Sequence, residues 1–523
     1  MRDTLRQSMA LFHTWSGLLL GWLLFAMFAT GTAAYFQDEI TRWMQPEVAG
    51  DANPALAAQG AVRFLNTVAP DGQSWYITLP NSRSATTQVY WQPSASKPAP
   101  RGETSAVLDR DGNRITTRET RGGFFLYRFH FDLHYMPVLW ARYLVGIAAM
   151  FMLVAIISGV ITHKKIFADF FMLRFGKGQR SWLDAHNVTA VLALPFHLMI
   201  TFTGLVTLAS MYMPWGIAAN YAAPTAFYEA VFGRAVAAEP TGKRVPLADL
   251  GPLVSAASNR WNGQRVGYIS IANPNDAAAR IDMTRSPEAS FGARGETASF
   301  DGATGRLIGA HDANGAALAT ESVMIGLHTG RFAKWGLRWL YFLSGLGGTI
   351  MVGSGLVLWT VKRRARLPDP SRPHLGFRMV ERLNIAAIAG LATGIAVYFL
   401  ANRLLPLDMA SRAEREIDSL FLAWLGIGLW GMIRPARRAW TETLAIAGAC
   451  FAAVPVINAL TTSRGLLPSL LAGDWTFVAF DLVMLVLAAG FAMAAVRSAK
   501  VRTKANAGQG SRTRRAAQKV TSA

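Results

Sequence analysis

Eight apolar runs separated by polar segments divide the chain. A membrane-spanning helix needs about 20 predominantly apolar residues, and the run at 420–433 is short for a complete span. The pattern therefore predicts an α-helical integral membrane protein with eight spans. The runs lie at residues 11–36, 136–162, 182–213, 335–361, 385–400, 420–433, 444–460 and 477–496.

Two long polar segments, residues 37–135 and 214–326, interrupt the first four runs. Each contains a helix-like stretch, several short strand-like pieces of alternating polarity, and a turn rich in Asp and Gly. These turns are Asp109–Gly112 in the first segment and Asp301–Arg306 in the second. Each insert is therefore predicted to be a small α+β module outside the membrane.

The apolar runs and the inserts together define a predicted domain organisation. Its divisions are 1–36 (first span), 37–135 (first insert), 136–163 (second span), 164–181 (cytoplasmic loop), 182–213 (third span), 214–326 (second insert), 327–362 (fourth span), 363–382 (cytoplasmic linker), 383–497 (four C-terminal spans) and 498–523 (a disordered basic tail).

Composition and charge agree with a lipid-embedded protein. Hydrophobic residues make up 52% of the chain and charged residues only 16%, against about 25% charged in ordinary soluble proteins. The net charge of +20 would fit a nucleic-acid-binding protein, but the basic residues gather beside the apolar runs, as the positive-inside rule requires. We therefore exclude nucleic acid as a partner.

The same basic residues orient the chain in the bilayer. With eight spans, the N-terminus, the loop at 164–180, the linker at 362–382 and the C-terminal tail fall on one side, which is the cytoplasmic side. Both termini are then cytoplasmic and both inserts periplasmic. The expected location is the bacterial cytoplasmic (inner) membrane.

The first four spans contain two copies of one unit. His13 and His186 are each followed eighteen residues later by a glycine, Gly31 and Gly204. A second match links the spans that follow the inserts. His134 leads to Ser158-Gly159, and His328 leads to Ser354-Gly355 over a spacing two residues longer. Four histidines thus occupy matched positions in a pseudo-two-fold arrangement.

Histidine in a membrane span indicates a functional site, because ionisable side chains are costly there. Imidazole is a good haem ligand. The repeat predicts that His13 faces His186 near the cytoplasmic side and that His134 faces His328 near the outer side. A four-helix bundle with two haems held by these pairs is the simplest construction.

Any haem in this chain would be a b-type haem, held without thioether bonds. The single cysteine, Cys450, lies in an apolar run. One cysteine allows no intrachain disulfide, no cysteine-ligated iron–sulfur cluster and no Cys-x-x-Cys-His haem attachment.

Other histidines compete for the ligand roles. His197 follows His186 by eleven residues, about three helical turns or roughly 16 Å, and is an alternative ligand for the outer haem. His163 is a weaker alternative, because Trp359 occupies its position in the second unit. His130 lies one turn before His134 and is a candidate supporting residue behind that ligand. The structural alternative for any one of them is a packing histidine at the membrane interface.

Arginines accompany the predicted outer ligands. Arg128, Arg142 and Arg338 lie near them in the sequence, and guanidinium suits carboxylates. Arg142 and Arg338 are therefore candidate contacts for haem propionates or for an anionic substrate. The alternative is that they extend from the bilayer to the interface without a ligand.

These histidine motifs resemble those of the PepSY-associated transmembrane family over residues 8–365. The turns of both inserts are similar to those of PepSY modules, which pack a helix on a small antiparallel sheet. The last four spans contain no histidine and lie outside the resemblance. The motifs are Phe12-His13-x-Trp15, Asp132-Leu133-His134, Ser158-Gly159 through His163, Trp182 through His186, Pro195-Phe196-His197 and Leu327-His328-Thr329-Gly330.

The resemblance implies a role in iron uptake, because some members resemble inner-membrane di-haem reductases of ferric siderophores. We therefore expect a haem-dependent oxidoreductase, a ferric-chelate reductase, that passes electrons from the inner face to a ferric siderophore or other ferric chelate outside. No Gly-rich dinucleotide fingerprint follows a predicted strand, so the electron donor would be a partner reductase or a quinol.

Two other functions compete with electron transfer. The first is a non-catalytic regulator that binds a periplasmic peptidase or sensor through its PepSY-like modules. The second is a transporter, since internal repeats are common among transporters. Neither alternative explains why histidines recur at matched positions.

Overall fold

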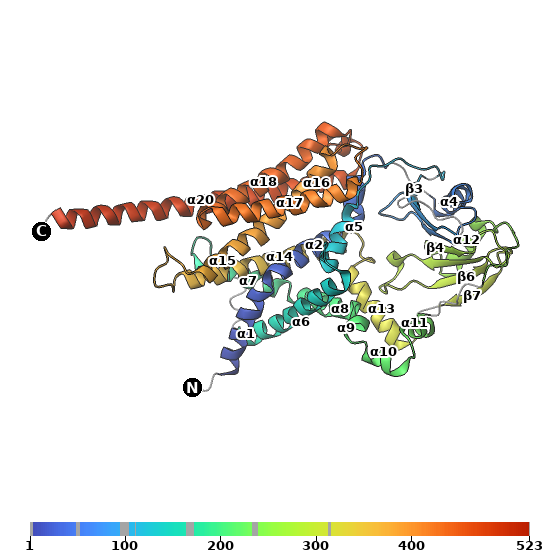
Figure 1. Cartoon of the computed structure of the whole chain (residues 1–523), viewed down its shortest axis with the longest axis horizontal. Helices are drawn as coiled ribbons and strands as arrows, with labels where there is room; N and C mark the ends of the chain where they lie inside the picture. Colours follow the sequence, from blue (N-terminus) through green and yellow to red (C-terminus); the bar gives the residue numbers. More distant parts are fainter. Residues whose placement is uncertain are drawn as a thin grey trace.

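The computed structural model describes residues 4–48, 53–94, 104–109, 111–163, 172–232, 239–311 and 315–521, with side chains only as far as Lys500 at the C-terminal end. The predicted cytoplasmic loop at 164–181 therefore lies partly outside the described residues. The molecule is elongated, with a helical bundle at one end and a β-sheet at the other (Figure 1).

The described chain is mostly helical and holds six to eight candidate membrane spans. Two of the eight are bent pairs, α1 (Leu5–Leu19) with α2 (Gly21–Ala34) and α7 (Gln179–Leu192) with α8 (Leu194–Thr207). The six unbroken candidates are α6 (Val138–Thr162), α14 (Trp335–Arg364), the continuous segment Leu375–Leu404, α17 (Arg412–Ile433), α18 (Ala436–Thr461) and the Trp475–Lys500 part of α20. All eight apolar runs of the sequence fall on these elements.

The two bends support an internal repeat. They are 66° between α1 and α2 and 69° between α7 and α8. Leu20 and Ala193 mark the breaks, and each lies seven residues after the matched histidine, His13 or His186. Pro195 in the first turn of α8 lacks the backbone N–H that would continue the preceding helix. The two units therefore share a bend as well as a sequence pattern.

The strands of the two inserts form one seven-stranded antiparallel sheet with the order β3-β2-β1-β4-β5-β6-β7. Strand β1 of the first insert pairs directly with β4 of the second, with Trp75 opposite Ile271. The sequence predicted a small α+β module in each insert, and the structure joins their strands in one sheet, because edge strands with unpaired backbone groups are satisfied by pairing with each other. The strands are β1 (Ser74–Thr78), β2 (Thr87–Gln92), β3 (Ser105–Leu108), β4 (Val266–Ala272), β5 (Arg280–Arg285), β6 (Thr297–Asp301) and β7 (Leu307–His311).

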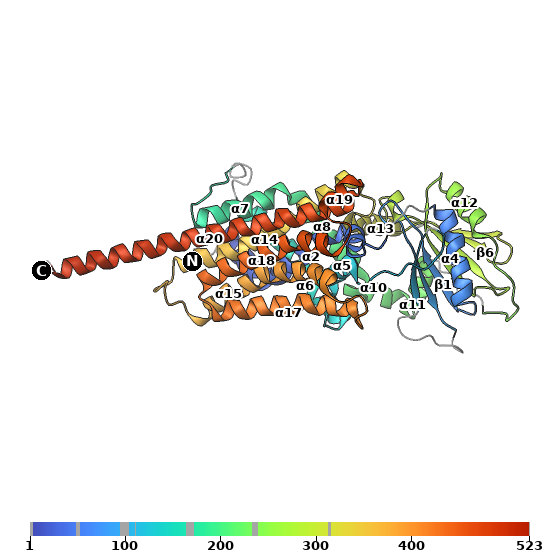
Figure 2. The same cartoon turned by 90° about the horizontal axis from the view of Figure 1, so that it is seen from above.

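One face of the sheet carries the hydrophobic core of both inserts. Helices α4 (Pro54–Val68) and α12 (Leu250–Arg260) cover this face (Figure 2). Strand β2 alternates strictly between buried and exposed positions, as a half-buried strand should. Trp75 from the first insert and Ile269 from the second are both fully buried in this core.

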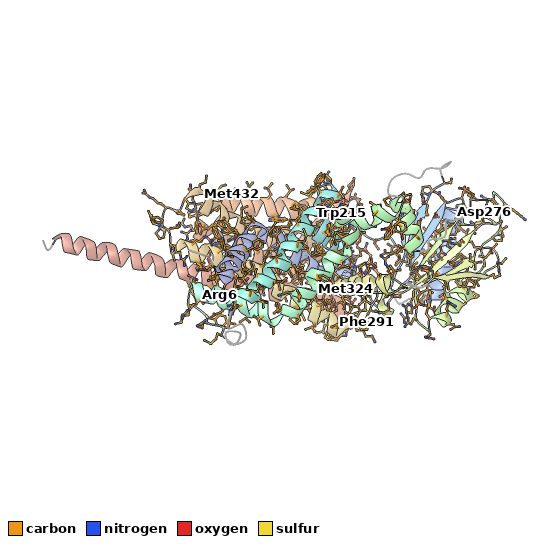
Figure 3. All side chains as sticks on the ribbon, turned by 90° about the horizontal axis from the view of Figure 1, so that it is seen from below. Arg6, Trp215, Asp276, Phe291, Met324 and Met432 are labelled. Atoms are coloured by element: carbon orange, nitrogen blue, oxygen red, sulfur yellow. The ribbon has the colours of Figure 1, made fainter. Side chains whose placement is uncertain are left out.

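Short helices connect the sheet to the bundle. Figure 3 places Trp215, Phe291 and Met324 in this connecting region. The connecting helices are α3 (Gln37–Met44), α5 (Gly122–Asp132), α9 (Ala209–Tyr212), α10 (Trp215–Asn220), α11 (Pro224–Phe232) and α13 (Ala316–Thr329), and a short 3-10 helix (Pro287–Ala289) follows β5.

The C-terminal helices form a second bundle beside α2 and α14 (Figure 1). Its first span consists of α15 (Leu375–Ile385), a π-helical turn (Ala386–Gly390) and α16 (Leu391–Leu404). The short helix α19 (Leu466–Leu471) precedes α20 (Trp475–Thr521). Since α20 continues as a helix to Thr521, the expected disordered tail is corrected to helix, in keeping with its content of Ala, Lys, Arg and Gln.

A buried charged network ties this bundle to the first insert. Arg412 and Glu416, both fully buried, form an ion pair. Asn402 donates to Glu416 at 2.7 Å, and Thr120, just before α5, donates to the other oxygen of that carboxylate. A buried ion pair is tolerated when its remaining polar atoms are bonded, so this network fixes the C-terminal bundle against the segment that leads into α5.

Candidate functional site

Two histidines from different units face each other at the end of the bundle far from the sheet. His13 on α1 and His186 on α7 have ring centres 6.2 Å apart and ring planes at 77°. The Nδ1 of His13 lies 2.8 Å from the carbonyl of Ala155, and that of His186 lies 2.8 Å from the carbonyl of Met351. A carbonyl accepts only from a protonated Nδ1, so Nε2 of each neutral ring is left as the free acceptor. We call His13 and His186 the distal pair.

A second pair lies at the end of the bundle near the sheet. His130 in the last turn of α5 and His328 in the last turn of α13 have ring centres 6.3 Å apart and planes at 34°. Their Nδ1 atoms lie 2.6 Å from the carbonyl of Met27 and 3.0 Å from that of Ile200. The tautomer is therefore the same as in the distal pair. We call His130 and His328 the sheet-side pair.

Each of the four rings lies against a glycine of a neighbouring helix. A Cβ atom added to Gly31 would lie 2.7 Å from the ring of His130, and one added to Gly204 would lie 2.8 Å from that of His328. In the distal pair, the corresponding approaches are 3.3 Å from Gly159 to His13 and 3.2 Å from Gly355 to His186. Glycine therefore allows each ring to reach the helix backbone.

The glycine and the carbonyl have a constant relation in all four places. The carbonyl that meets Nδ1 always belongs to the residue four positions before the glycine, and a Ser or Thr always directly precedes the glycine. The hydroxyl donates to a carbonyl of its own helix, as Ser158 does to Ala155 and Ser354 does to Met351. The glycines singled out by the repeat are thus the residues on which the four histidine rings pack.

His134, the expected partner of His328, does not face it. Helix α5 ends at Asp132, and Leu133 takes a left-handed conformation with φ 48°, so His134 lies beyond the helix end. Its ring stacks on Phe421 at 5.5 Å and packs on Tyr135 at 4.3 Å. Partial burial lowers the pKa of the His134 ring, and the carboxylates of Glu414 and Asp418 oppose this effect. The pairing of His134 with His328 is therefore corrected to His130 with His328.

Neither alternative ligand belongs to the pairs. His197 on α8 is 1% exposed and its ring packs edge-on against Phe28 at 5.9 Å. His163 lies at the C-terminal end of α6, and its Nε2 is 3.0 Å from the side-chain nitrogen of Asn187. His197 packs against Gly348, and neither of its ring nitrogens has a hydrogen-bond partner among the described residues. The ligand roles expected for His197 and His163 therefore stay predictions.

A cavity of about 370 Å³ adjoins the sheet-side pair. Both histidines and their glycines, Gly31 and Gly204, line it. Gln37 also lines it, and the side-chain oxygen of Gln37 is buried without a hydrogen-bond partner among the described residues. An unpaired buried polar atom is uncommon in a folded protein, so the cavity is suited to a ligand.

The predicted arginine contacts divide into two groups. Arg142 lines the cavity and forms an ion pair with Asp132 at 2.9 Å. Arg338 instead forms an ion pair with Glu39 at 2.8 Å, donates to the carbonyl of Ala333, and is absent from the residues that line the cavity. The expected propionate contact of Arg338 is therefore corrected, because this side chain joins α14 to α3.

Sequence reasoning assigned His130 only a supporting place and overlooked Arg331, which also lines the cavity. His134 and His130 precede Gly159 by 25 and 29 residues, and His328 precedes Gly355 by 27. The spacing of His328 lies midway between the other two, so spacing alone does not choose between His134 and His130. Gly330 marks the end of α13 in the sequence, but the left-handed Leu133 that ends α5 is seen only in the structure. No sequence signal therefore separates His130 from His134.

The geometry of both pairs fits a metal bound between two imidazoles. The ring centres lie 6.2 and 6.3 Å apart, which would leave room for one ion bonded to both imidazoles at about 2.0 Å. Among the described residues, no group of three or more His, Cys, Asp or Glu side chains is arranged to hold a metal ion. Each pair therefore suits a metal whose other ligands come with it, as the four nitrogens of a porphyrin do.

Comparison with known proteins gives two matches. The family described as PepSY-associated TM region matches residues 10–362, which include both units and all four paired histidines. An uncharacterized protein of Pseudomonas aeruginosa is 28% identical over 357 residues, covering 63% of this chain and 85% of that protein.

Proposed function

The chain belongs to the PepSY-associated transmembrane family, and on that premise we propose that it is a membrane electron-transfer protein with two b-type haems. One haem lies between His13 and His186, and the other between His130 and His328. The observation that carries the proposal is the fourfold repetition of one arrangement, a ring seated on a glycine with Nδ1 at a helix carbonyl.

The residues of each pair act by holding a neutral imidazole in one orientation. The carbonyl fixes the tautomer, which turns the basic Nε2 into the ligand, and it raises the basicity of that nitrogen. The glycine lets the ring approach the helix, so that little rotation remains. Bound haem would supply one-electron chemistry at each pair, so that an electron crosses the bundle in steps.

The direction and the reaction are part of the same proposal. In this proposal the distal pair lies at the cytoplasmic side of the inner membrane and the sheet in the periplasm, and the positive-inside rule supports this orientation. Electrons would enter from a partner reductase or a quinol at the distal pair and leave from the sheet-side pair to a ferric siderophore or another ferric chelate. The activity would be that of a ferric-chelate reductase for iron uptake.

The first test is an absorption spectrum. The detergent-purified full chain, expressed with ample haem supply, is compared before and after dithionite reduction, and haem is counted per chain by pyridine haemochrome. We expect b-type bands and two haems per chain. A colourless protein would contradict the proposal and favour a regulator that binds a periplasmic peptidase or sensor.

The second test assigns the ligands. His13→Ala and His328→Ala should each lower the haem count by one, and the remaining haem should differ between the two variants in its electron paramagnetic resonance spectrum. His374→Ala is the control, because His374 caps the N-terminus of α15 and faces neither pair. An unchanged haem count in His13→Ala would rule out the distal site.

A further inference from the structure

We propose that the C-terminal bundle positions His130 and that Tyr398, on α16, is the positioning residue. The inference rests on the proposed function in that its effect is read on the sheet-side haem. It assigns a task to four spans that contain no histidine and lie beyond the residues matched by the family. The contact of this bundle with α5 can also be measured without haem.

Helix α5 is too short to hold His130 in place by itself. It has 11 residues, ends at the left-handed Leu133, and follows Arg121, whose side chain makes no capping hydrogen bond. Isolated helices shorter than about 12–15 residues are marginally stable in water. The direction of α5, and with it the position of the His130 ring, is therefore set by the elements that pack against this helix.

The buried aromatic residues of α5 face the C-terminal bundle. The ring of Phe125 lies 5.2 Å from that of Tyr398, and the ring of Phe129 lies 5.4 Å from that of Phe421. Phe125 and Phe129 belong to a hydrophobic core that they share with α16 and α17. His130, the next residue, instead lines the cavity beside the sheet-side pair. A shift of Phe129 against the bundle would therefore also move the His130 ring.

Tyr398 holds the first turn of α5 by a hydrogen bond. Its side chain is fully buried, and its hydroxyl donates to the carbonyl of Gly122 at 2.9 Å. From the α3 side, the hydroxyl of Thr41 accepts from the backbone N–H of Gly123 at 3.0 Å. A Cβ atom added to Gly122 would lie 2.5 Å from that hydroxyl. The start of α5 is therefore enclosed between α3 and Tyr398.

The residues that lead into α5 are bound by the same bundle. Arg118 donates to a carbonyl of α16 at 2.9 Å, and Arg412 donates to the carbonyl of Glu119, also at 2.9 Å. Thr120 donates to Glu416 in the buried charged network. Three consecutive residues are thus held by α16 and α17, so the path of the chain into α5 is fixed by the C-terminal bundle.

The other three histidines are carried by elements that pack within the two units. His13 lies on α1, which packs on α6, and His186 lies on α7, which packs on α14. His328 lies on α13, which packs on α8. Helix α5 also packs on α2, but its buried aromatic residues meet the C-terminal bundle. The distal haem is therefore an internal reference for any change at the sheet-side haem.

Movement of His130 would alter the sheet-side haem through its ligand. The carbonyl of Met27 accepts from Nδ1 of His130 at 2.6 Å, which makes Nε2 a stronger donor to iron and stabilises Fe(III) over Fe(II). A shift of α5 weakens this hydrogen bond, so the midpoint potential rises. It also changes the angle between the ring planes, 34° in this pair, and that angle governs the electron paramagnetic resonance spectrum of a low-spin haem.

The test compares Tyr398→Phe with wild type, both as the full chain purified in detergent. Phenylalanine keeps the ring that packs on Phe125 and removes the hydrogen bond to Gly122. We expect an unchanged haem count and an altered resonance spectrum of the sheet-side haem. Its reduction equilibrium should shift about threefold toward Fe(II), or about 28 mV for one electron, as loss of one neutral hydrogen bond would give. The distal haem should keep its spectrum and its potential.

Thr443→Val is the matched control. Thr443 is fully buried in the same bundle, and its hydroxyl donates to the carbonyl of Ala439 at 2.7 Å within α18. The variant therefore removes a buried hydroxyl-to-carbonyl bond that joins no two helices. An unchanged sheet-side haem in Tyr398→Phe would overturn the inference. Equal changes at both haems, or the same change in Thr443→Val, would do so as well, because the effect would then be general to the protein.

Hydrogen exchange supplies a measurement that does not need haem. The amides of α5 should exchange faster in Tyr398→Phe than in wild type, while those of α13 keep their protection. A wild type without haem would refute the proposed electron transfer, and faster exchange confined to α5 would still support positioning of His130 by Tyr398. Unchanged exchange of α5 in such a protein would overturn the inference as well.

Discussion

A histidine can serve these sites only where its ring meets a glycine and its Nδ1 meets a carbonyl. His130 satisfies both conditions, at Gly31 and at Met27. His134 satisfies neither, because Leu133 ends the helix in a left-handed conformation and turns the following residues toward Phe421. A difference of four residues in sequence therefore separates a candidate ligand from an aromatic contact with the C-terminal bundle.

The assignment of His130 gives a residue-scale prediction. His130→Ala should remove the haem nearer the sheet, because one imidazole remains to bind it, whereas His134→Ala should keep both haems. The haem count by pyridine haemochrome and the reduced spectrum measure the difference. Loss of one haem in His134→Ala, with none lost in His130→Ala, would instead support the pairing of His134 with His328 that the spacing predicts.

At the scale of helices, the four rings hold each unit together and set the two units opposite each other. Each histidine sits on a glycine of its own unit, as His13 does on Gly159 of α6, and faces the histidine of the other unit. The bends at Leu20 and Ala193 change the direction of each first span between the distal and sheet-side pairs. Close approach at glycine is what allows these contacts, as in other membrane helix pairs.

The glycines on which the histidine rings pack give an element-scale prediction. Gly204→Ala places a Cβ about 2.8 Å from the His328 ring, so the ring must move away from its carbonyl. We expect loss of the sheet-side haem with the distal haem kept. The matched control is Gly347→Ala on α14, where a Cβ meets nothing within 4 Å and alanine improves helix propensity.

An unchanged haem count in Gly204→Ala would contradict this prediction, since the His328 ring and the helix that carries Gly204 would then have moved apart without loss of the haem. Loss of both haems would point instead to general unfolding of the bundle, which circular dichroism of the same sample would reveal.

At the scale of the whole molecule, the two inserts are one structural unit. The pairing of β1 with β4 gives them a common sheet, and Trp75 and Ile269 share its core. Arg83, after β1, binds Glu39 at 2.6 Å, and Glu39 also binds Arg338. The sheet is therefore fixed above the sheet-side pair by contacts with both α3 and α14.

The shared core gives a whole-molecule prediction. Trp75→Ala removes a fully buried side chain whose indole donates to the carbonyl of Ala69 at 3.0 Å, and such truncations cost about 3–5 kcal/mol. Hydrogen exchange should increase in β4 and β5 of the second insert as well as in β1 and β2. Thr78→Ala, exposed on the same strand, should leave both inserts protected.

Hydrogen exchange that increases only in the first insert of Trp75→Ala would contradict the common core and would indicate that the inserts are two independent modules. The haem spectrum should be little changed in either case, since no histidine of either pair lies in the sheet or in the two helices that cover it.

The sequence by itself determined the spans, the inserts and the repeat. Apolar length and the period of the strands are local properties, and the recurrence of His13 and His186 at equal distance from Gly31 and Gly204 is readable in one dimension. The repeat also singles out Ser158-Gly159 and Ser354-Gly355 in the sequence. These features depend only on neighbours along the chain.

Only the tertiary structure decided which groups meet. The fusion of the two inserts depends on backbone pairing between residues nearly 200 positions apart, and the use of Arg338 depends on Glu39, a residue of another helix. His130 replaced His134 because a helix end lies between them, and its place is set by packing of α5 on α2. Long-range contacts of this kind leave no periodic trace in the sequence, so spacing could bring each histidine near its site but could not choose between two that were four residues apart.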